Sequence, residues 1–577
     1  MKRAIYILCG MCILWGCSLK EEVVSNSTRD TYYRNEIQVR TGLSGCYTPA
    51  RNFICNSGFW QMTECTTDLI SMSVSNQYNA NCDVSPSRPG IASTVWSNGY
   101  TGVMRCNEII DVLTESECFT EEQKLPWIAE AKVLRALYYY YLTSTFGDVP
   151  FYTEAVTEHN RAKIASLPRM SADETRDYII DEMMEYLLPP SMGGMRALPY
   201  QRTYENPSKA YAGAAVGLMV AGKMCLWNER YADAIKIFGQ LEEIYGDYRT
   251  VKTKYDFGKD YPLTDVRWRS RNVKESILEV GNRVEEYGLA IKGTIASYCM
   301  PPRTTVDSDD EEESASKASD IYNGIKIPEL GAYARTYTAA MPTSYYYTRV
   351  LPYMSDDLRN GEYSGSKDKP DRKEPKGGCG NLAWRWKGEG YVKEKVLTEK
   401  QGIYWFNKPS SNVPNASADK PYGNNQPWLG DKFWCFGMYN NQDGNNYKIF
   451  RYAGVLLNLA EAHLMGNGDM QTACDYLNIV RARAGLLDEL TPETVNNSPE
   501  ALMEEIRMEC ARELLGEFQR KYDLVRWGIW YERTYMYNEG KYIKGYMLPC
   551  HEYWPIPAEQ VTYSGNALDN NAYKGIL

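Results

Sequence analysis

Residues 122–146, EQKLPWIAEAKVLRALYYYYLTSTF, carry the strongest helical pattern of the chain. Apolar positions recur along it every three or four residues, at Ile128, Ala131, Leu134, Tyr138 and Leu142. This spacing is typical of one face of an α-helix. The stretch runs into Gly147-Asp148-Val149-Pro150, where a glycine and then a proline end a helix. The sequence therefore predicts a long helix over 122–146.

Other helices are predicted on the C-terminal side, several of them in pairs. One pair lies within 207–246 around a turn at Asn228, and another lies within 451–486 around Gly466-Asn467-Gly468-Asp469. Small residues where the paired helices cross make the pairs similar to tetratricopeptide units, with an irregular helical bundle as the alternative. We therefore expect a mainly α fold built on a tetratricopeptide-like scaffold. Single helices are predicted after the capping-box residues Ser171 and Glu174, over about 498–515, and over about 517–530.

Two stretches have no helical period. Residues 251–445 are interrupted by Gly, Pro, Asn, Ser and Tyr and contain short strand-like runs such as ESILEVGN at 275–282; residues 61–92 have a similar composition. Long irregular segments on a regular scaffold are often functional surfaces. We therefore expect a long loop-rich insertion that carries short strands.

The charge and aromatic composition narrow the kinds of ligand. The 577 residues include 64 Lys and Arg against 74 Asp and Glu, for a net charge of −10, which disfavours nucleic acid. The histidines, His159, His463 and His551, are far apart in sequence and have no metal-ligand spacing. The chain has 47 Tyr and 14 Trp but only 12 Phe, and rings with a polar group suit wet recognition surfaces.

The N-terminus has the pattern of an export signal. Two basic residues precede an apolar run of eleven residues, Ala4–Leu14, whereas a membrane span needs about 20. The run ends in Leu14-Trp15-Gly16-Cys17, which resembles a bacterial lipoprotein processing site, although Trp15 is atypical. We expect a signal peptide over 1–16, a lipid on Cys17 and a tether over 17–28. An ordinary secretory signal is the alternative.

The cysteines are mostly expected to be free. Cys9 and Cys12 form a CxxC pattern, but it lies within the signal. Thirteen cysteines follow Cys17, an odd number without CxxC spacing, in a chain too large to need disulfide staples. We expect most of them to pack as small apolar side chains, and a pair such as Cys46 with Cys55 stays open.

Four segments of the chain share their patterns with one family. They are the start that ends at Cys17, AEAKVLRALYYYYLTSTFGDVPFY at 129–152, the helix-pair sequence within 451–486, and RELLGEFQRKYDLVRWG at 512–528. The closing segments WPIPAEQ and NALDNNAY fit the same pattern. Together these segments resemble the SusD-like (SusD/RagB) nutrient-binding lipoproteins of the bacterial outer membrane.

The resemblance implies a fold, a cargo and a partner. It implies a single, mostly helical domain over 29–577 whose long loops form a binding face. It also implies an oligosaccharide as cargo, or a peptide as in some members, and a SusC-like TonB-dependent transporter in the outer membrane, over which the lipoprotein sits as a lid. The helical scaffold is expected at about 29–60, 93–250 and 446–532, and the ligand-face loops at about 61–92 and 251–445.

Candidate ligand contacts come from the two loop regions. A sugar ring has an apolar face and a rim of hydroxyls, so its site needs flat rings and planar polar side chains. In the first loop Asn76 and Tyr78 fit this need, with an Asn-rich turn that bonds its own backbone as the alternative. Trp384-Arg385-Trp386 is the most pointed candidate in the second, because alternate residues of a strand face one side. The other candidates there are Tyr298, Arg303, Tyr322, Tyr333, Tyr337 and Tyr345.

Several conspicuous aromatic residues are instead expected to be structural. Trp96, Tyr100 and Trp127 lie in predicted helices and are expected in the core. The four tyrosines 138–141 cannot share one helix face, so we expect most of them to pack inside with their hydroxyls bonded.

Two charged groups are also expected to have no ligand role. Arg520, Asp523, Arg526 and Trp527 look like a polar cluster that joins helices. The acidic run at 307–313 lacks the glycine and spacing of a calcium loop, so we expect a solvated charge run, with calcium binding as the alternative.

No catalytic motif is found in the sequence. GxSxG, HExxH and a phosphate-binding glycine loop do not occur, and the family resemblance argues against a glycosidase carboxylate pair. We therefore expect no enzymatic activity, no cofactor and no metal site. The predicted function is a cell-surface, lipid-anchored receptor that captures an oligosaccharide and delivers it to a transporter. The alternatives are a peptide receptor and a helical-repeat scaffold for other surface lipoproteins.

Overall fold

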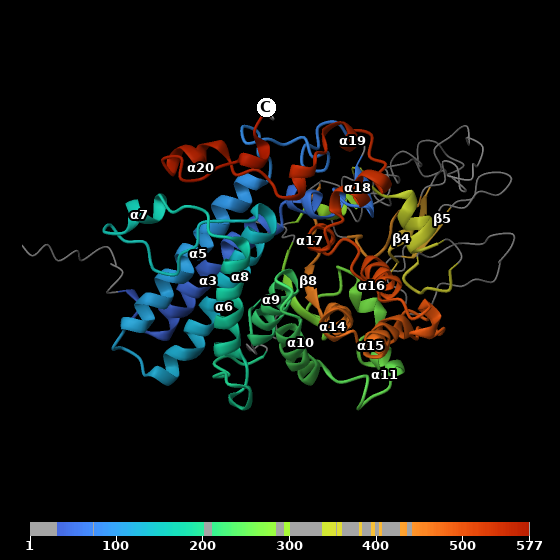
Figure 1. Cartoon of the computed structure of the whole chain (residues 1–577), viewed down its shortest axis with the longest axis horizontal. Helices are drawn as coiled ribbons and strands as arrows, with labels where there is room; N and C mark the ends of the chain where they lie inside the picture. Colours follow the sequence, from blue (N-terminus) through green and yellow to red (C-terminus); the bar gives the residue numbers. More distant parts are fainter. Residues whose placement is uncertain are drawn as a thin grey trace, which may run out of the picture.

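The computed structural model describes residues 32–72, 74–200, 211–283, 293–299, 337, 339–352, 355–360, 380–383, 394–397, 403–406, 427–435 and 441–575. These residues are mostly helical, which confirms the predicted fold class (Figure 1). The helices are α3 Glu36–Ile54, α4 Ser57–Trp60, α5 Ala92–Glu115, α6 Glu121–Phe146, α7 Arg161–Ala165, α8 Ala172–Leu187, α9 Ala214–Trp227, α10 Tyr231–Tyr245, α11 Lys254–Asp260, α12 Ile295–Cys299, α14 Tyr452–Asn467, α15 Met470–Arg483, α16 Pro499–Glu513, α17 Arg520–Arg526, α18 Trp530–Tyr537, α19 Ile543–Tyr546 and α20 Ala558–Tyr563. The strands are β1 Ile70–Met72, β2 Ser276–Val280, β3 Ala340–Pro342, β4 Leu382–Ala383, β5 Glu394–Leu397, β6 Ile403–Phe406, β7 Trp428–Leu429 and β8 Tyr447–Arg451.

The larger helices form one continuous array. Along the array α3 packs on α5, α5 on α6, α6 on α8, α8 on α9, α9 on α10, α10 on α14, and α14 on α15. Figure 1 shows α17 to α20 crossing one side of this array. Consecutive antiparallel helices that each bury a face against the next are what a tetratricopeptide-like scaffold requires. The two predicted helix pairs are present as α9 with α10 and α14 with α15.

Helix α6, at the predicted position, is fixed at both ends by its own sequence. The Thr120 side chain accepts a hydrogen bond from the Gln123 N–H, and the Gln123 side chain accepts one from the Thr120 N–H. This is a capping box, which satisfies two donors that a helix start leaves unpaired. At the other end Gly147 has φ +70°, a conformation that favours glycine. The chain then turns away from the helix axis after Phe146.

The tyrosines at 138–141 are all buried, as expected, but only two of their hydroxyls are bonded. The Tyr138 hydroxyl donates to the Cys46 carbonyl, and the Tyr139 hydroxyl donates to the Tyr152 carbonyl at 2.8 Å. The hydroxyls of Tyr140 and Tyr141 have no hydrogen-bond partner within the described residues. The expectation that most of these hydroxyls are bonded is therefore met by half of them.

This difference gives a matched pair of substitutions on one helix. We expect Tyr139→Phe to lower the free energy of unfolding by about 1–2 kcal/mol, because the Tyr139 hydroxyl also accepts from the Tyr152 N–H at 3.0 Å and two backbone groups would lose their partner. Tyr140→Phe removes a hydroxyl that bonds nothing and should leave stability unchanged or raise it slightly. Urea denaturation followed by circular dichroism measures both. Equal effects of the two variants would contradict this assignment.

The helix predicted over about 517–530 is present but shorter. The structure has α17 at Arg520–Arg526, and α18 begins only at Trp530. Phe518 has φ +62°, which is not helical, so α17 begins only after it. Gly528 has φ +68°, and the helix ends before it. The Ile529 N–H then bonds the Leu524 carbonyl at 3.0 Å before α18 begins. The glycine inside an apolar periodic pattern was the local signal for this break.

The described strands form pairs that bring distant parts of the chain together. The predicted strand within 275–282 is β2, which pairs antiparallel with β8, and β1 pairs antiparallel with β3. The β2–β8 pair lies beside α14, because β8 runs directly into that helix. The strands thus tie the loop-rich middle of the chain to the helical scaffold.

A buried ionic cluster sits where β8 meets α14. The Arg451 guanidinium, with no exposed side-chain surface, bonds Glu275 at 2.8 Å, Glu513 at 2.9 Å and Glu517 at 2.8 Å. Buried charges persist only when they are paired and hydrogen-bonded. The other buried partners are Arg483 with Glu275 and Glu513, Lys432 with Glu517, and Arg359 with Glu509 and Glu513. The two glutamates of RELLGEFQ therefore act as structural counter-ions at the centre of the fold.

The expected polar cluster around α17 is also present. Asp523 bonds Lys223 of α9 at 3.3 Å and Arg526 at 2.9 Å. Glu461 of α14 accepts from Arg526 and from the Trp527 indole N–H at 3.1 Å. These contacts join three helices, so the cluster is structural, as the sequence predicts.

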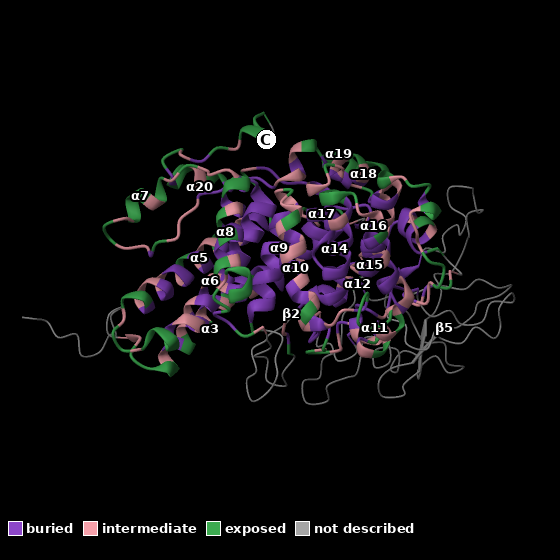
Figure 2. Ribbon diagram, turned by 60° about the horizontal axis from the view of Figure 1, so that its bottom comes forward, coloured by how far each residue is buried: buried purple, intermediate pink, exposed green. Residues whose placement is uncertain are grey.

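Burial explains why α9 and α14 are apolar on nearly every side. Figure 2 shows both helices as buried ribbon in the middle of the molecule, with exposed residues concentrated on α3, α7, α19 and α20. α9 has 14 residues and α14 has 16. In the part of the chain that the structure describes, no helix is both long and apolar enough to cross a membrane.

The cysteines behave as small core side chains. Of the twelve cysteines among the described residues, ten are buried. Cys46 and Cys55 are both among the buried free thiols, so the pair that the sequence left open does not form. Burial raises the pKa of Cys55 to about 12, which keeps it an unreactive thiol.

Candidate functional site

The first predicted loop, between β1 and α5, divides into a bonded interior and an exposed tip. Asn79 accepts from the Ile91 N–H at 2.9 Å, and Asn81 donates to the Val74 carbonyl at 2.9 Å. The alternative of an Asn-rich turn that bonds its own backbone is therefore right for these two residues. Asn76 is exposed, and Tyr78 is 46% exposed with the Arg88 guanidinium 5.3 Å from its ring centre. The tip thus presents an amide and a flat ring to solvent.

A second pair of rings lies at α12. The rings of Tyr298 and Tyr337 have their centres 5.3 Å apart and are tilted by 40°. The Tyr337 N–H donates to the Ser297 carbonyl at 2.6 Å, and this hydrogen bond holds Tyr337 next to Tyr298. Tyr298 is half-buried and Tyr337 is 49% exposed. These rings offer partly open faces of the kind that stack on a sugar.

The β1–β3 pair brings these two groups into one region. β1 leads into the loop that carries Asn76 and Tyr78, and β3 follows Tyr337 and packs near α12. The Asn538 amide anchors the start of the loop by donating to the carbonyls of Cys65, Thr67 and Ile70. We call Asn76, Tyr78, Tyr298 and Tyr337 the loop face.

Some residues considered in the sequence are structural. Tyr345 is buried and stacks on Tyr537 with ring centres 4.0 Å apart, so its candidacy as a ligand contact is wrong. Trp96 and Trp127 lie in the core as expected, whereas Tyr100 is only half-buried. The remaining predicted residues lie outside the described part of the chain and stay predictions: Cys17, Arg303, the acidic run 307–313, Tyr322, Tyr333, Trp384 and Trp386.

Asp68, which precedes the first loop, also has a structural role. It bonds Arg520 at 2.7 Å and Arg533 at 2.9 Å. Burial alone would raise the pKa of Asp68, but the charges and hydrogen bonds of these two arginines lower it below its ordinary value. The carboxylate therefore stays ionised and fixes the base of the loop.

A buried carboxyl, Asp443, supports the helix that carries Tyr298. It accepts from the Ala296 N–H at 3.0 Å, in the first turn of α12, and from the Tyr447 hydroxyl at 3.1 Å. Burial raises the pKa of Asp443 to about 6 in spite of these hydrogen bonds. The ionised form is therefore the costly one in the folded protein.

We expect Asp443→Asn to change how stability depends on pH. The pKa of Asp443 is raised from 3.8 to about 6, so the wild type should lose about 2.4 kcal/mol relative to the Asn variant as pH rises from 4 to 7.5. Denaturant unfolding of both proteins at each pH measures this, and all other carboxyl groups cancel in the difference. A difference between the two proteins that does not vary with pH would contradict the raised pKa.

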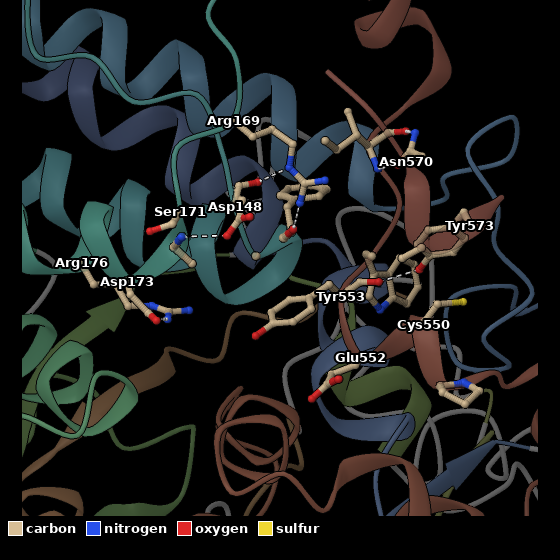
Figure 3. A pocket seen from close by; sticks show the side chains of 17 residues that line it. Asp148, Arg169, Ser171, Asp173, Arg176, Cys550, Glu552, Tyr553, Asn570 and Tyr573 are labelled. Atoms are coloured by element: carbon tan, nitrogen blue, oxygen red, sulfur yellow. Dashed lines mark hydrogen bonds and ion pairs between the residues drawn. The ribbon is translucent and has the colours of Figure 1, made fainter. Parts of the chain in front are cut away.

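A separate cavity of about 390 Å³ lies between the segment 146–176 and the C-terminal segment 549–573 (Figure 3). Figure 3 shows Tyr553 between Arg176 and Asp173 on one side and Tyr573 and Cys550 on the other. The Tyr573 hydroxyl donates to the Tyr553 carbonyl at 2.6 Å, which fixes this wall. Sequence reasoning missed the cavity because its walls lie almost 400 residues apart and share no motif. No group of three His, Cys, Asp or Glu side chains in the described ranges is placed to hold a metal ion.

Comparison with known proteins places the chain in a family. Residues 327–573 match the model of the SusD family, and residues 26–212 match a second model, described as "Starch-binding associating with outer membrane". The two models together cover well over half of the sequence and both halves of the fold. The chain belongs to the SusD/RagB family. A SusD-like protein from Formosa agariphila is 22% identical over 597 residues, and the match covers 97% of each chain.

Solved SusD-like structures share the fold. A SusD-like protein from Bacteroides fragilis has a TM-score of 0.63 and 18% identity, with 94% of this chain and 97% of that one covered. Surface glycan-binding protein A from Bacteroides thetaiotaomicron, solved in complex with laminarihexaose, has a TM-score of 0.61 and 18% identity, with 93% of this chain and 100% of that one covered. The SusD fold therefore extends over nearly the whole chain.

Proposed function

We propose that this SusD-family protein is a cell-surface lipoprotein of the outer membrane that binds an oligosaccharide and passes it to a SusC-like TonB-dependent transporter. The lipid on Cys17 holds it at the membrane, and the protein itself carries out no catalysis. The loop face, extended by Arg303, Tyr322, Tyr333, Trp384 and Trp386, makes the contacts with the glycan.

One observation carries this proposal: a protein with the same fold over nearly its whole length binds laminarihexaose. The loop face supports it, since Tyr78 and Tyr337 are each about half exposed and Asn76, two residues before Tyr78, is exposed too. Rings with open faces beside amides match the apolar face and hydroxyl rim of a sugar. Binding by the protein alone is weak in this proposal, because desolvation of hydroxyls offsets most of the stacking energy. Enclosure by the transporter strengthens it.

Affinity gel electrophoresis of the full-length protein tests glycan binding. A panel of polysaccharides that includes laminarin is cast into native gels, with a peptide mixture tested in parallel by calorimetry. We expect retardation in at least one polysaccharide gel. Binding to the peptides alone would replace the glycan by a peptide cargo, and turnover of any glycan would refute the absence of catalysis.

Trp384→Ala with Trp386→Ala tests the most pointed candidates. We expect this double variant to lose retardation in the gel that retards the wild type, because two stacking rings are removed at once. Its melting temperature should stay that of the wild type, which circular dichroism checks. Unchanged retardation would remove both tryptophans from the site.

A further inference from the structure

The cavity in Figure 3 is lined by buried donors that have no partner among the residues the structure describes. Arg176 and Trp554 both line it and are each only 2% exposed. The Nε of Arg176 and the indole nitrogen of Trp554 have no hydrogen-bond partner within the described residues. Buried polar atoms are nearly always bonded, and these two donors, one from each wall of the cavity, can pair with acceptors of a ligand.

The same cavity also has acceptors with spare capacity. Glu552 lines it, is half-buried, and its carboxylate makes no hydrogen bond within the described residues. Asp148 uses one carboxylate oxygen to accept from the Ala172 N–H at 2.9 Å, and Asp173 uses one to bond Arg176 at 3.0 Å. The remaining oxygens of these groups can accept from ligand hydroxyls. The cavity thus matches a ligand that both donates and accepts.

The charge balance of the lining restricts the ligand further. The lining includes three carboxylates, those of Asp148, Asp173 and Glu552, and two guanidiniums, those of Arg169 and Arg176. Arg169 is already occupied, because it donates to three backbone carbonyls. An anion would meet the carboxylates and a cation would meet buried Arg176, and either encounter is costly at low dielectric. A neutral molecule with several hydroxyls meets neither penalty.

We propose that this cavity is a second carbohydrate site, which holds one neutral sugar unit through Arg176, Glu552 and Tyr553. Its volume of about 390 Å³ lies within the range of small-ligand sites, about 300–1,000 Å³. Half-buried Tyr553 supplies a ring beside the polar groups, as sugar recognition requires. This inference rests on the proposed glycan function.

The second site lies where one glycan chain can reach both sites. The C-terminal segment that forms its wall continues to α20, where the Ala558 N–H donates to the Pro86 carbonyl of the first loop at 2.9 Å. Figure 1 shows this segment and the first loop on the same side of the helix array. Two weak sites on one polymer raise the overall affinity without new contacts.

Titration calorimetry with the full-length protein tests the second site, with laminarihexaose as the first probe and any glycan retained in the gels as the next. We expect two binding events in the wild type. Ala572→Trp places an indole on an exposed position that lines the cavity, and it should remove one event while the melting temperature stays unchanged. Tyr78→Ala with Tyr298→Ala should remove the other event. Glu559→Ala, which changes an exposed carboxylate of α20 outside the cavity, should keep both.

Each outcome is decisive for one proposal. Two unchanged events in a folded Ala572→Trp variant, or a single event in the wild type, overturn the second site and leave the glycan function standing. A wild type that binds no glycan overturns the proposed function itself. If Ala572→Trp does not fold, Glu552→Ala replaces it, with an expected loss of at least tenfold in affinity at one site. Unchanged affinity in that variant also overturns the second site.

Discussion

Replacing Arg451 by methionine is expected to lower the free energy of unfolding by about 3–5 kcal/mol. Arg451 has no exposed side-chain surface and bonds Glu275, Glu513 and Glu517. Methionine fills much of the same space but leaves three buried carboxylates short of a counter-ion, and an uncompensated buried charge is far more costly than a lost contact. Chemical denaturation measures the change.

A surface ion pair provides the matched control for Arg451. Arg40 bonds Glu36 at 2.7 Å one helical turn away, and about half of each side chain is exposed. Arg40→Met removes the same charge at a solvent-exposed position and should lower the free energy of unfolding by less than about 1 kcal/mol. Similar losses in the two variants would show that the buried cluster does not hold β8 to α14 and α16.

Removing two rings of the loop face is expected to abolish most glycan binding at that face. Tyr78→Ala and Tyr298→Ala should each weaken binding at least tenfold, about 1.4 kcal/mol, because each takes away a stacking surface. The affinity of the double variant should fall about a hundredfold if the two substitutions act independently. Calorimetric titration of each purified variant gives the dissociation constants.

An exposed tyrosine of the scaffold serves as the control for this loss. Tyr178 on α8 is 44% exposed, close to the 46% of Tyr78, and it lies outside both predicted loop regions. Tyr178→Ala should leave glycan binding unchanged. Equal losses in Tyr78→Ala and Tyr178→Ala would mean that aromatic exposure alone, and not the loop face, explains the binding.

The helical part of the fold was predictable because its signals are local. Apolar spacing, the glycine and proline after Phe146, and the turn at Asn228 lie within or next to the helices that they define. The break at Gly528 is local too, but a glycine in an apolar period does not by itself distinguish a packed helix from its end. The cluster around Asp523 was predictable as structural, because its charges lie on one short helix motif.

The candidate site was less predictable because long-range pairing creates it. Nothing in the sequence near Ile70 indicates that β1 pairs with β3 about 270 residues later, and this pairing places the two loop regions together. Tyr345 and Tyr337 lie in the same irregular stretch but differ in exposure. Tyr345 is buried and stacks on Tyr537, whereas Tyr337 is exposed. The cavity beside Tyr553 depends on two segments that lie almost 400 residues apart in the chain, and it has no sequence signal.

Glycan binding at the loop face is tested most sharply by calorimetric titration of the wild type and the Tyr78→Ala, Tyr298→Ala double variant with the glycan that retards the wild type most. We expect saturable binding by the wild type, a large loss of affinity in the double variant, and the same melting temperature for both proteins. Full wild-type affinity in a folded double variant would contradict this expectation, since the glycan would then be held away from the loop face.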